Sequence, residues 1–273
     1  MLSKPKESIL SGRSPSYRFL SYLVVIALGL SAVIGGSCVF RHTRTAPAAP
    51  TSAPEPLAAF RATHEPAQKQ ALMQELLRIE PDTAYGHFAQ AFLHAVAGHD
   101  TAAEAEYRAA IALKPDLGDA FLGLGSVLFN QDKNDAAIAA FKQAAALDPN
   151  RSEPQLDLGI LYYALGDLNQ AIAADRQAVA IDPKLAEGHY NLGLALYGAG
   201  RAADARTAFQ RAVELEPDLV EARFNLAVAL DILDEDVAAG REYQAFIDRA
   251  GDAHPDQTAY AQKRIAIITK RKP

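Results

Sequence analysis

The sequence predicts an all-α protein built from tandem pairs of helices, and three observations lead to this prediction. Proline recurs every 34 residues in similar contexts, at Pro81, Pro115, Pro149, Pro183 and Pro217. Each interval holds two helical stretches joined by a turn, such as residues 186–200 and 203–216. The composition favours Ala and Leu, with one Cys and no Trp, which suits helices and excludes a disulfide-stapled scaffold.

Two columns of small residues support this register independently of the prolines. The predicted units span residues 84–117, 118–151, 152–185, 186–219 and 220–253. The twentieth place of every unit is Ala: Ala103, Ala137, Ala171, Ala205 and Ala239. The eighth place holds only Ala or Gly: Ala91, Gly125, Gly159, Gly193 and Ala227. Small side chains let the two helices of a unit approach closely, and stacked units then share one continuous core.

Turn and stop signals complete the pattern. Gly98, Gly166 and Gly200 stand where the first helix ends and a positive φ is favoured. Asp132 and Asp234 replace glycine at that place. The proline then ends the second helix, because it lacks an N–H and clashes with the preceding turn.

Column by column, residues 84–253 resemble the tetratricopeptide repeat (TPR) family. The resemblance implies a right-handed superhelix, an α-solenoid of antiparallel helix pairs. Before it, residues 57–83 match only the second half of a unit and predict a partial, degenerate repeat. After it, residues 254–273 predict a capping helix with a basic tail. On that helix we expect Ala261, Ile265 and Ile268 to face the stack, and Lys263, Arg264 and Lys270 to face water.

The N-terminal part of the chain predicts a membrane anchor. Residues 19–40 carry no charge, and a helix of that length rises roughly 33 Å, enough to cross a hydrocarbon core of about 30 Å. The basic residues 1–18 precede it, so the N-terminus is expected in the cytoplasm and the repeats in the periplasm. Residues 41–56 follow as a Pro/Ala-rich linker.

Two alternatives compete with the anchor. A cleaved secretory signal would release the repeats, and a lipoprotein signal would make Cys38 the acylated first residue. We favour the anchor because the apolar run exceeds the usual length of a signal peptide's apolar region.

Charge and motif content exclude several functions. The chain carries a net charge of −6, and residues 45–273 hold 21 basic against 32 acidic side chains, which argues against nucleic acid as a partner. The sequence contains no phosphate-binding loop, metal-ligand pair or nucleophile beside a base, so we expect no catalytic site, metal or cofactor. Asp175 occupies the twenty-fourth place, where other units have Tyr or Phe. We expect it at a partly exposed rim.

The resemblance implies a concave groove lined by the first helix of each unit. The residues of this chain at the matching places are Phe88, Phe92, Leu122, Phe129, Leu156, Asp157, Tyr163, Tyr190, Asn191, Tyr197, Phe224 and Asn225. Asp119, Glu153, Glu187 and Glu221 form an acidic edge. Asn191 and Asn225 are expected to bond a ligand backbone, and Tyr190 with Phe224 to be needed for partner capture. The ninth place is mostly aliphatic, which favours a hydrophobic segment as the partner.

One ligand class of the family is not expected. Relatives that grip a C-terminal carboxylate use Lys, Asn and Arg at set places. In residues 152–253 only Asn191 matches, while Leu156, Ile160, Glu221 and Asn225 occupy the other places.

The sequence thus predicts a membrane-tethered, non-enzymatic scaffold that holds a peptide or protein during assembly of an envelope complex. Two alternatives remain open. In one, the groove receives a second copy of the chain, as in a homodimer. In the other, the protein is a non-catalytic subunit that delivers substrate to an enzyme complex.

Overall fold

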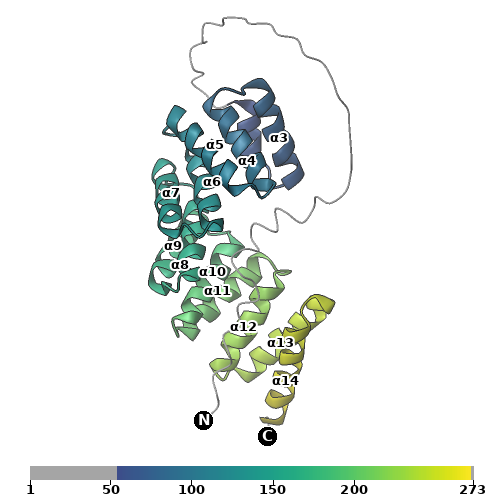
Figure 1. Cartoon of the computed structure of the whole chain (residues 1–273). Helices are drawn as coiled ribbons and strands as arrows, with labels where there is room; N and C mark the ends of the chain where they lie inside the picture. The colour runs from purple at the N-terminus through teal and green to yellow at the C-terminus, as the bar shows by residue number, and fades with distance from the viewer. Residues whose placement is uncertain (1–53, 272–273) are drawn as a thin grey trace, which may run out of the picture. The chain divides into compact units, whose positions relative to one another are not determined.

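A computed structural model describes residues 54–271, which form thirteen α-helices, α2 to α14, joined by short turns (Figure 1). The predicted cytoplasmic segment 1–18, the predicted membrane segment 19–40 and Cys38 lie outside the described residues. Among residues 54–271, no helix is both long and apolar enough to span a bilayer.

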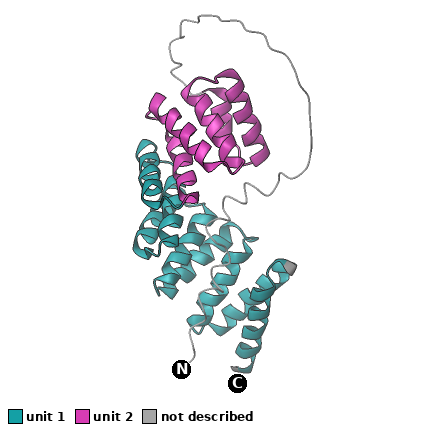
Figure 2. Cartoon of the chain, viewed as in Figure 1, with its two compact units in different colours: residues 1–15, 132–273 teal, residues 16–131 magenta. Residues whose placement is uncertain are grey.

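The described helices divide into two compact units, shown separately coloured in Figure 2. We call residues 54–131 the N-terminal unit and residues 132–271 the C-terminal unit. The N-terminal unit contains α2 (Glu55–Ala62), α3 (Pro66–Ile79), α4 (Ala84–Val96), α5 (Asp100–Leu113) and α6 (Gly118–Asn130). The C-terminal unit contains α7 (Asn134–Leu147), α8 (Glu153–Ala164), α9 (Leu168–Ile181), α10 (Ala186–Gly198), α11 (Ala202–Leu215), α12 (Val220–Ile232), α13 (Asp236–Ala250), a 3-10 turn η2 (Gly251–Ala253) and α14 (Pro255–Arg271).

Helices that follow each other in sequence pack as pairs within each unit, among them α4 with α5, α8 with α9, α10 with α11 and α12 with α13. The alanines of the twentieth place explain this close packing, because all five have no exposed surface. The helix-pair array is therefore all-α and built as the small-residue columns predict. The right-handed course of the whole superhelix stays a prediction.

The turns inside the pairs adopt the left-handed backbone, with positive φ, that the sequence predicts. Gly98, Gly166 and Gly200 have φ of +74°, +78° and +74°. Asp132 and Asp234 occupy the same place with φ of +58° and +57°. A side chain at positive φ is unfavourable, so these two aspartates hold a conformation that glycine adopts without strain.

The segment before the first predicted unit differs from the expectation. The linker was expected to extend to residue 56, yet α2 begins at Glu55, because a proline at the start of a helix loses no hydrogen bond. Leu57 of α2 is fully buried, and Phe60 meets the rings of Phe88 and Phe92 edge-on at centroid distances of 5.7 and 5.1 Å. The segment thus forms a helix pair, α2 with α3, whose first helix has only 8 residues.

The capping helix α14 packs on α13, with Ala261 and Ile268 buried as expected. Arg264 was expected to face water, and this was wrong. Its guanidinium turns inward to the carboxylate of Asp231 on α12, at 2.5 and 2.6 Å.

Candidate functional site

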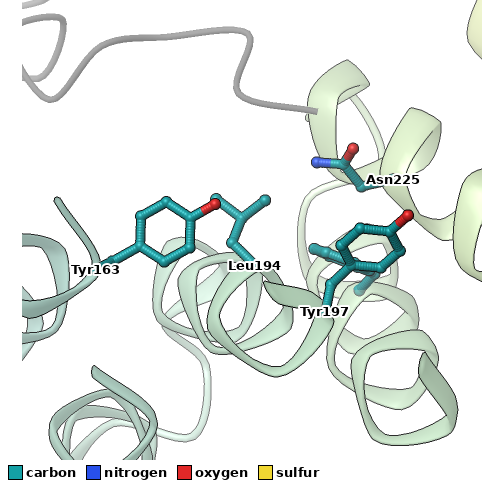
Figure 3. A pocket seen from close by; sticks show the side chains of 5 residues that line it. Tyr163, Leu194, Tyr197 and Asn225 are labelled. Carbon is teal, nitrogen blue, oxygen red and sulfur yellow. The ribbon is translucent and has the colours of Figure 1, made fainter. Parts of the chain in front are cut away.

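A small, solvent-open hollow lies in the C-terminal unit among α8, α10, α11 and α12. Its lining consists of Tyr163, Leu194, Tyr197, Phe209 and Asn225 (Figure 3). The walls are apolar and aromatic, and they also carry two phenol groups and one amide. Such a mixture suits a small apolar side chain whose backbone needs hydrogen bonds.

Phe209 reaches the hollow from the second helix of its pair because of a glycine. A Cβ on Gly193 of α10 would lie only 2.5 Å from the Phe209 ring, so any larger residue there would push the ring away. The ring is 1 % exposed and forms the floor of the hollow. The small residue at the eighth place therefore shapes the site as well as the helix pair.

Asn225 brings an unsatisfied amide to the hollow. Its side chain is buried, its Nδ2 donates to the Tyr190 hydroxyl at 3.4 Å, and its Oδ1 has no hydrogen-bond partner. Asn191, one pair earlier, has a buried Nδ2 that is likewise unpartnered. A buried amide group without a partner costs about 1–3 kcal/mol, so a ligand that bonds it recovers this cost.

The Tyr197 phenol of the hollow stays protonated in neutral solution. Burial raises the pKa of the Tyr197 hydroxyl above its ordinary value, with a smaller contribution from Tyr260. A neutral phenol can both donate and accept a hydrogen bond, so Tyr197 can serve either polar group of a peptide backbone.

Several of the predicted groove residues come together here. Tyr163, Tyr197 and Asn225 line the hollow itself. Tyr190 is linked to Asn225 by the hydrogen bond described above, and its ring lies 6.0 Å from that of Phe209. Asp157 on α8 and Asn191 on α10 occupy the repeat position that Asn225 has on α12, and both are half-buried.

Other predicted groove residues belong to the core instead, which corrects the expectation for them. Phe224 is fully buried, with its ring 5.1 Å from Phe246 and 5.9 Å from Tyr260. Leu156 and Phe88 are also buried. The fifth place of a first helix therefore points into the stack in these units, and the joint role expected for Tyr190 and Phe224 cannot apply to Phe224.

In the N-terminal unit the predicted groove residues Phe92, Leu122 and Phe129 are half-buried, and Phe60 covers part of Phe92.

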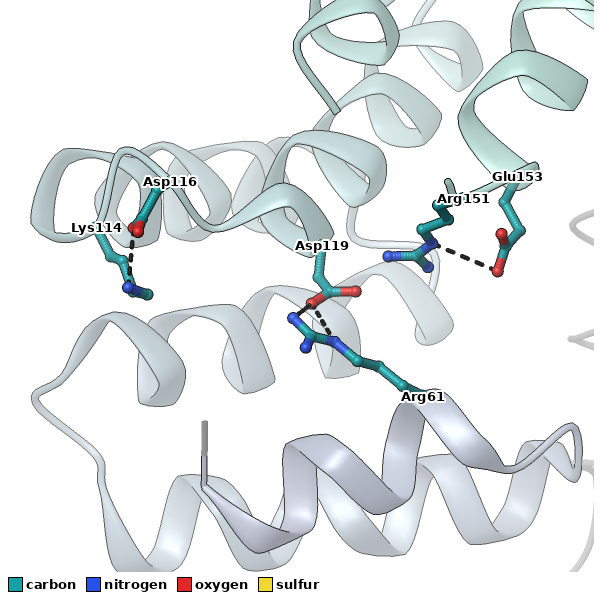
Figure 4. A network of polar contacts seen from close by, with 6 residues as sticks. All are labelled: Arg61, Lys114, Asp116, Asp119, Arg151 and Glu153. Carbon is teal, nitrogen blue, oxygen red and sulfur yellow. Dashed lines mark hydrogen bonds and ion pairs between the residues drawn. The ribbon is translucent and has the colours of Figure 1, made fainter. Parts of the chain in front are cut away.

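Asp119, the member of the predicted acidic edge that lies in the N-terminal unit, does not face solvent. The side chain of Asp119 is almost fully buried and receives a hydrogen bond from Nε of Arg61 at 2.8 Å, with Nη2 of the same guanidinium on the same oxygen (Figure 4). Arg61 thus holds α2 against α6 within the N-terminal unit, and Asp119 has a structural role as its ion-pair partner.

The C-terminal end of the array has a comparable ion pair. Asp231 accepts hydrogen bonds from both Nε and Nη2 of Arg264, and from the Tyr243 hydroxyl at 3.2 Å. The carboxylate of Asp231 raises the pKa of Arg264. Burial, reinforced by the nearby acid, raises the pKa of Tyr243.

The buried carboxylate of Asp175 also corrects an expectation. The twenty-fourth place is buried in all five units, and Asp175 is 1 % exposed rather than part of a rim. Its carboxylate packs on α8 at Gly159, where an added Cβ would lie 2.0 Å from Oδ1.

Metal chemistry finds no support in residues 54–271. No group of three or more His, Cys, Asp or Glu side chains in that part of the chain is arranged to hold a metal ion. His87, on the first helix of its unit, instead pairs through Nδ1 with Glu106 at 2.6 Å.

Comparison with known families identifies the repeat. A model described as TPR repeat matches residues 125–166 and 159–200, and a tetratricopeptide repeat model matches residues 186–219. The chain contains tetratricopeptide repeats. The TPR family forms protein-interaction scaffolds and is non-catalytic.

Solved structures support the same fold. The MamA protein superimposes with a TM-score of 0.57 at 19 % identity, covering 62 % of this chain and 93 % of its own. YrrB, described as a TPR protein with an unusual peptide-binding site, superimposes with a TM-score of 0.57 at 20 % identity, covering 70 % of this chain and 97 % of its own. PilF from Pseudomonas aeruginosa superimposes with a TM-score of 0.57 at 18 % identity, covering 69 % of this chain and 89 % of its own. At these identities the likeness concerns the fold, and a comparison with curated protein sequences finds no match.

Two lining residues of this TPR site were missing from the predicted set. Leu194 occupies the ninth place, whose aliphatic column favours a hydrophobic partner. Phe209 lies on a second helix, whereas the predicted groove consists of first helices. The signal for it was the glycine at position 193 together with an aromatic residue at the twenty-fourth place.

Proposed function

We propose that the C-terminal unit of this TPR scaffold binds an extended segment of a partner protein across α8, α10 and α12. The observation that carries this proposal is the unpartnered Asn225 Oδ1 at an open apolar hollow, together with the unpartnered Asn191 Nδ2 on α10, a helix that also contributes to the hollow. One is an acceptor and the other a donor, which are the two groups needed to match a peptide N–H and C=O.

The hollow supplies the apolar part of this recognition. Tyr163, Leu194 and Tyr197 present a small apolar surface on which an aliphatic side chain of the bound segment packs. The amides orient the segment, because each backbone hydrogen bond contributes about 1 kcal/mol net.

Crosslinking from a defined position tests this site. A photoreactive phenylalanine analogue placed at Tyr197 of the full-length chain should form an adduct with a partner in native membranes. The same analogue at Gln177, exposed on the second helix α9, is the matched control. The proposal requires that Asn225→Leu suppresses the Tyr197 adduct. Adducts of equal yield from both positions, or an adduct unaffected by Asn225→Leu, would contradict it.

We further propose that residues 19–40 tether the scaffold to a membrane, with the repeats on the periplasmic side, and that it serves assembly of an envelope complex. The support is the uncharged apolar run and the excess of basic residues before it. Alkaline carbonate extraction tests the tether, because a spanning helix resists it. Release of the chain from carbonate-washed membranes would contradict an anchor, and the mass of the mature N-terminus would reveal cleavage or acylation at Cys38.

A further inference from the structure

Tyrosine and asparagine recur at equivalent places of consecutive repeats around the hollow. Tyr163 on α8 and Tyr197 on α10 both occupy the twelfth place of their units, and both are partly exposed (Figure 3). Asn191 on α10 and Asn225 on α12 both occupy the sixth place, and each has a buried amide atom without a hydrogen-bond partner. The surface therefore offers an aromatic ring and an amide at intervals of one repeat.

This interval selects the conformation of a segment that contacts both tyrosines. The helices α8 and α10 contact each other, and the axes of helices in contact lie about 8–10 Å apart. Residues that share a face of a β-strand lie about 6.6 or 13 Å apart, which does not match this interval. Three residues of a polyproline II helix advance about 9.3 Å and complete one turn, so residues i and i+3 share a face at the matching distance. The surface thus fits a polyproline II segment whose two anchors are three residues apart.

The shallow surface suits proline at these anchors. A proline ring is compact and apolar, and it packs on aromatic side chains without a deep pocket. A polyproline II backbone makes no internal hydrogen bonds, so its C=O and N–H groups remain available to Asn191 Nδ2 and Asn225 Oδ1. Residues between two such prolines retain the N–H that proline lacks. This recognition needs no charge on the ligand.

The chain itself contains a segment with this pattern. Residues 45–53 read TAPAAPTSA and are uncharged, with Pro47 and Pro50 three residues apart. Pro50 precedes Glu55, the first residue of α2, by five residues, so it stays within about 18 Å of the N-terminal unit of its own chain. The hollow belongs to the C-terminal unit, and a second copy can offer it without this restriction.

We propose that residues 45–53 dock at the hollow of a second copy as a polyproline II segment, with one proline on Tyr163 and the other on Tyr197. This inference rests on the binding site described under the proposed function. The segment and a partner protein then compete for one surface, so self-association and partner binding exclude each other. Pro47→Ala with Pro50→Ala would release the surface.

Peptide titration tests the recognition of this segment. A fluorescent peptide of residues 45–53 is added to the full-length chain carrying Pro47→Ala and Pro50→Ala, whose own segments no longer compete. We expect saturable binding that Asn225→Leu weakens about tenfold, the value of about one hydrogen bond. The matched peptide with Pro50→Ala and Thr51→Pro places its prolines four residues apart, on different faces of the helix, and should bind about fivefold more weakly.

The outcomes of this titration separate the two proposals. Equal binding of the two peptides would overturn the polyproline II register. No binding of the first peptide would overturn this inference, whereas a partner adduct at Tyr197 that Asn225→Leu suppresses would still support the proposed function. Peptide binding that Asn225→Leu does not affect would overturn the assignment to this site.

Crosslinking of the purified full-length chain tests the contact between copies. The photoreactive phenylalanine analogue at Tyr197 should give an adduct of twice the chain mass, joined to residues 45–53 of the second copy. Pro47→Ala with Pro50→Ala should reduce its yield about fivefold, and the analogue at Gln177 is the control. Adducts within single chains, or adducts joined to other residues, would overturn the assignment to a second copy's segment.

Discussion

Asn225 illustrates how a single residue combines a structural cost with the binding role that we propose for it. Its side chain is buried at the edge of the hollow, and Tyr190 satisfies only one of its two amide groups. Such an arrangement is unfavourable for the isolated fold, because a buried polar atom has lost its water without gaining a partner. A bound peptide backbone would provide that partner.

Asn225→Leu is therefore expected to separate binding from stability. The substitution should leave the free energy of unfolding unchanged or raise it by up to about 1 kcal/mol, because it removes an unsatisfied buried oxygen. Partner binding should weaken roughly tenfold, the value of about one hydrogen bond. Urea unfolding and titration with the partner measure the two quantities. Asn169→Leu, on the exposed face of α9, is the control, and parallel loss of stability and binding would contradict the prediction.

Phe224→Ala is expected to act on the fold. The ring is enclosed by Tyr243, Phe246 and Tyr260, so its removal leaves a cavity at the junction of α12, α13 and α14. We expect a loss of about 3–5 kcal/mol in the free energy of unfolding, measured by urea denaturation. A loss below about 1 kcal/mol would show that Phe224 does not form part of the core.

Replacing the turn residue Asp234 is expected to raise the free energy of unfolding, whereas Phe224→Ala lowers it. It holds a φ of +57° at the place where other pairs have glycine. Asp234→Gly should stabilise the C-terminal unit by about 0.5–1 kcal/mol, because glycine adopts this conformation without steric strain. The urea midpoint should rise with an unchanged slope. A fall in the midpoint would indicate that the aspartate makes a compensating interaction.

At each end of the described array, an arginine of the terminal helix forms an ion pair with a buried carboxylate. Arg61 holds α2 through Asp119 in the N-terminal unit, and Arg264 holds α14 through Asp231 in the C-terminal unit. An end helix has a neighbour on one side only, so it buries less apolar surface than a central one. The ion pair adds a directional contact where the hydrophobic contribution is smallest.

Arg264→Ala is expected to loosen α14. We expect a loss of about 2–3 kcal/mol, because the buried carboxylate of Asp231 then lacks its charged partner. Hydrogen exchange of the α14 amides should accelerate more than that of α10. Lys263→Ala, an exposed neighbour, is the control. If α14 exchanges equally in both variants, the ion pair does not hold this helix.

The whole molecule is expected to lose stability in alkaline solution. Burial raises the pKa of Tyr107, Tyr197, Tyr243 and Tyr260. Below a pH of about 10 these tyrosines are protonated in both the folded and the unfolded chain, so the stability is fully present. Above it the unfolded chain releases its protons first, and the free energy of unfolding falls by about 1.4 kcal/mol per pH unit for each such tyrosine.

Thermal unfolding between neutral and strongly alkaline pH measures this effect, together with the ultraviolet absorbance of tyrosinate. Tyr107→Phe removes one contributing group and should make the decline shallower. A transition temperature that is constant through the ionisation of the exposed tyrosines would contradict the prediction.

The sequence by itself determined the repeat, because its register is written in residues that act locally. Proline ends a helix, glycine or aspartate permits the positive φ, and alanine allows close approach, whatever surrounds them. The same local logic located three members of the site, Tyr163, Tyr197 and Asn225, at recurring places of the first helices.

Only the tertiary structure decided which side of each helix is covered, and by what. The burial of Phe224, the inward turn of Arg264 and the contribution of Phe209 through the gap at Gly193 depend on residues that are distant in sequence. The helix α2 likewise exists where prolines suggested a linker, since Leu57, Phe60 and Arg61 find partners on α4 and α6 or within the core. A repeat specifies its helices through short-range geometry, whereas its binding surface is what neighbouring helices leave uncovered, and that depends on packing between residues far apart in the chain.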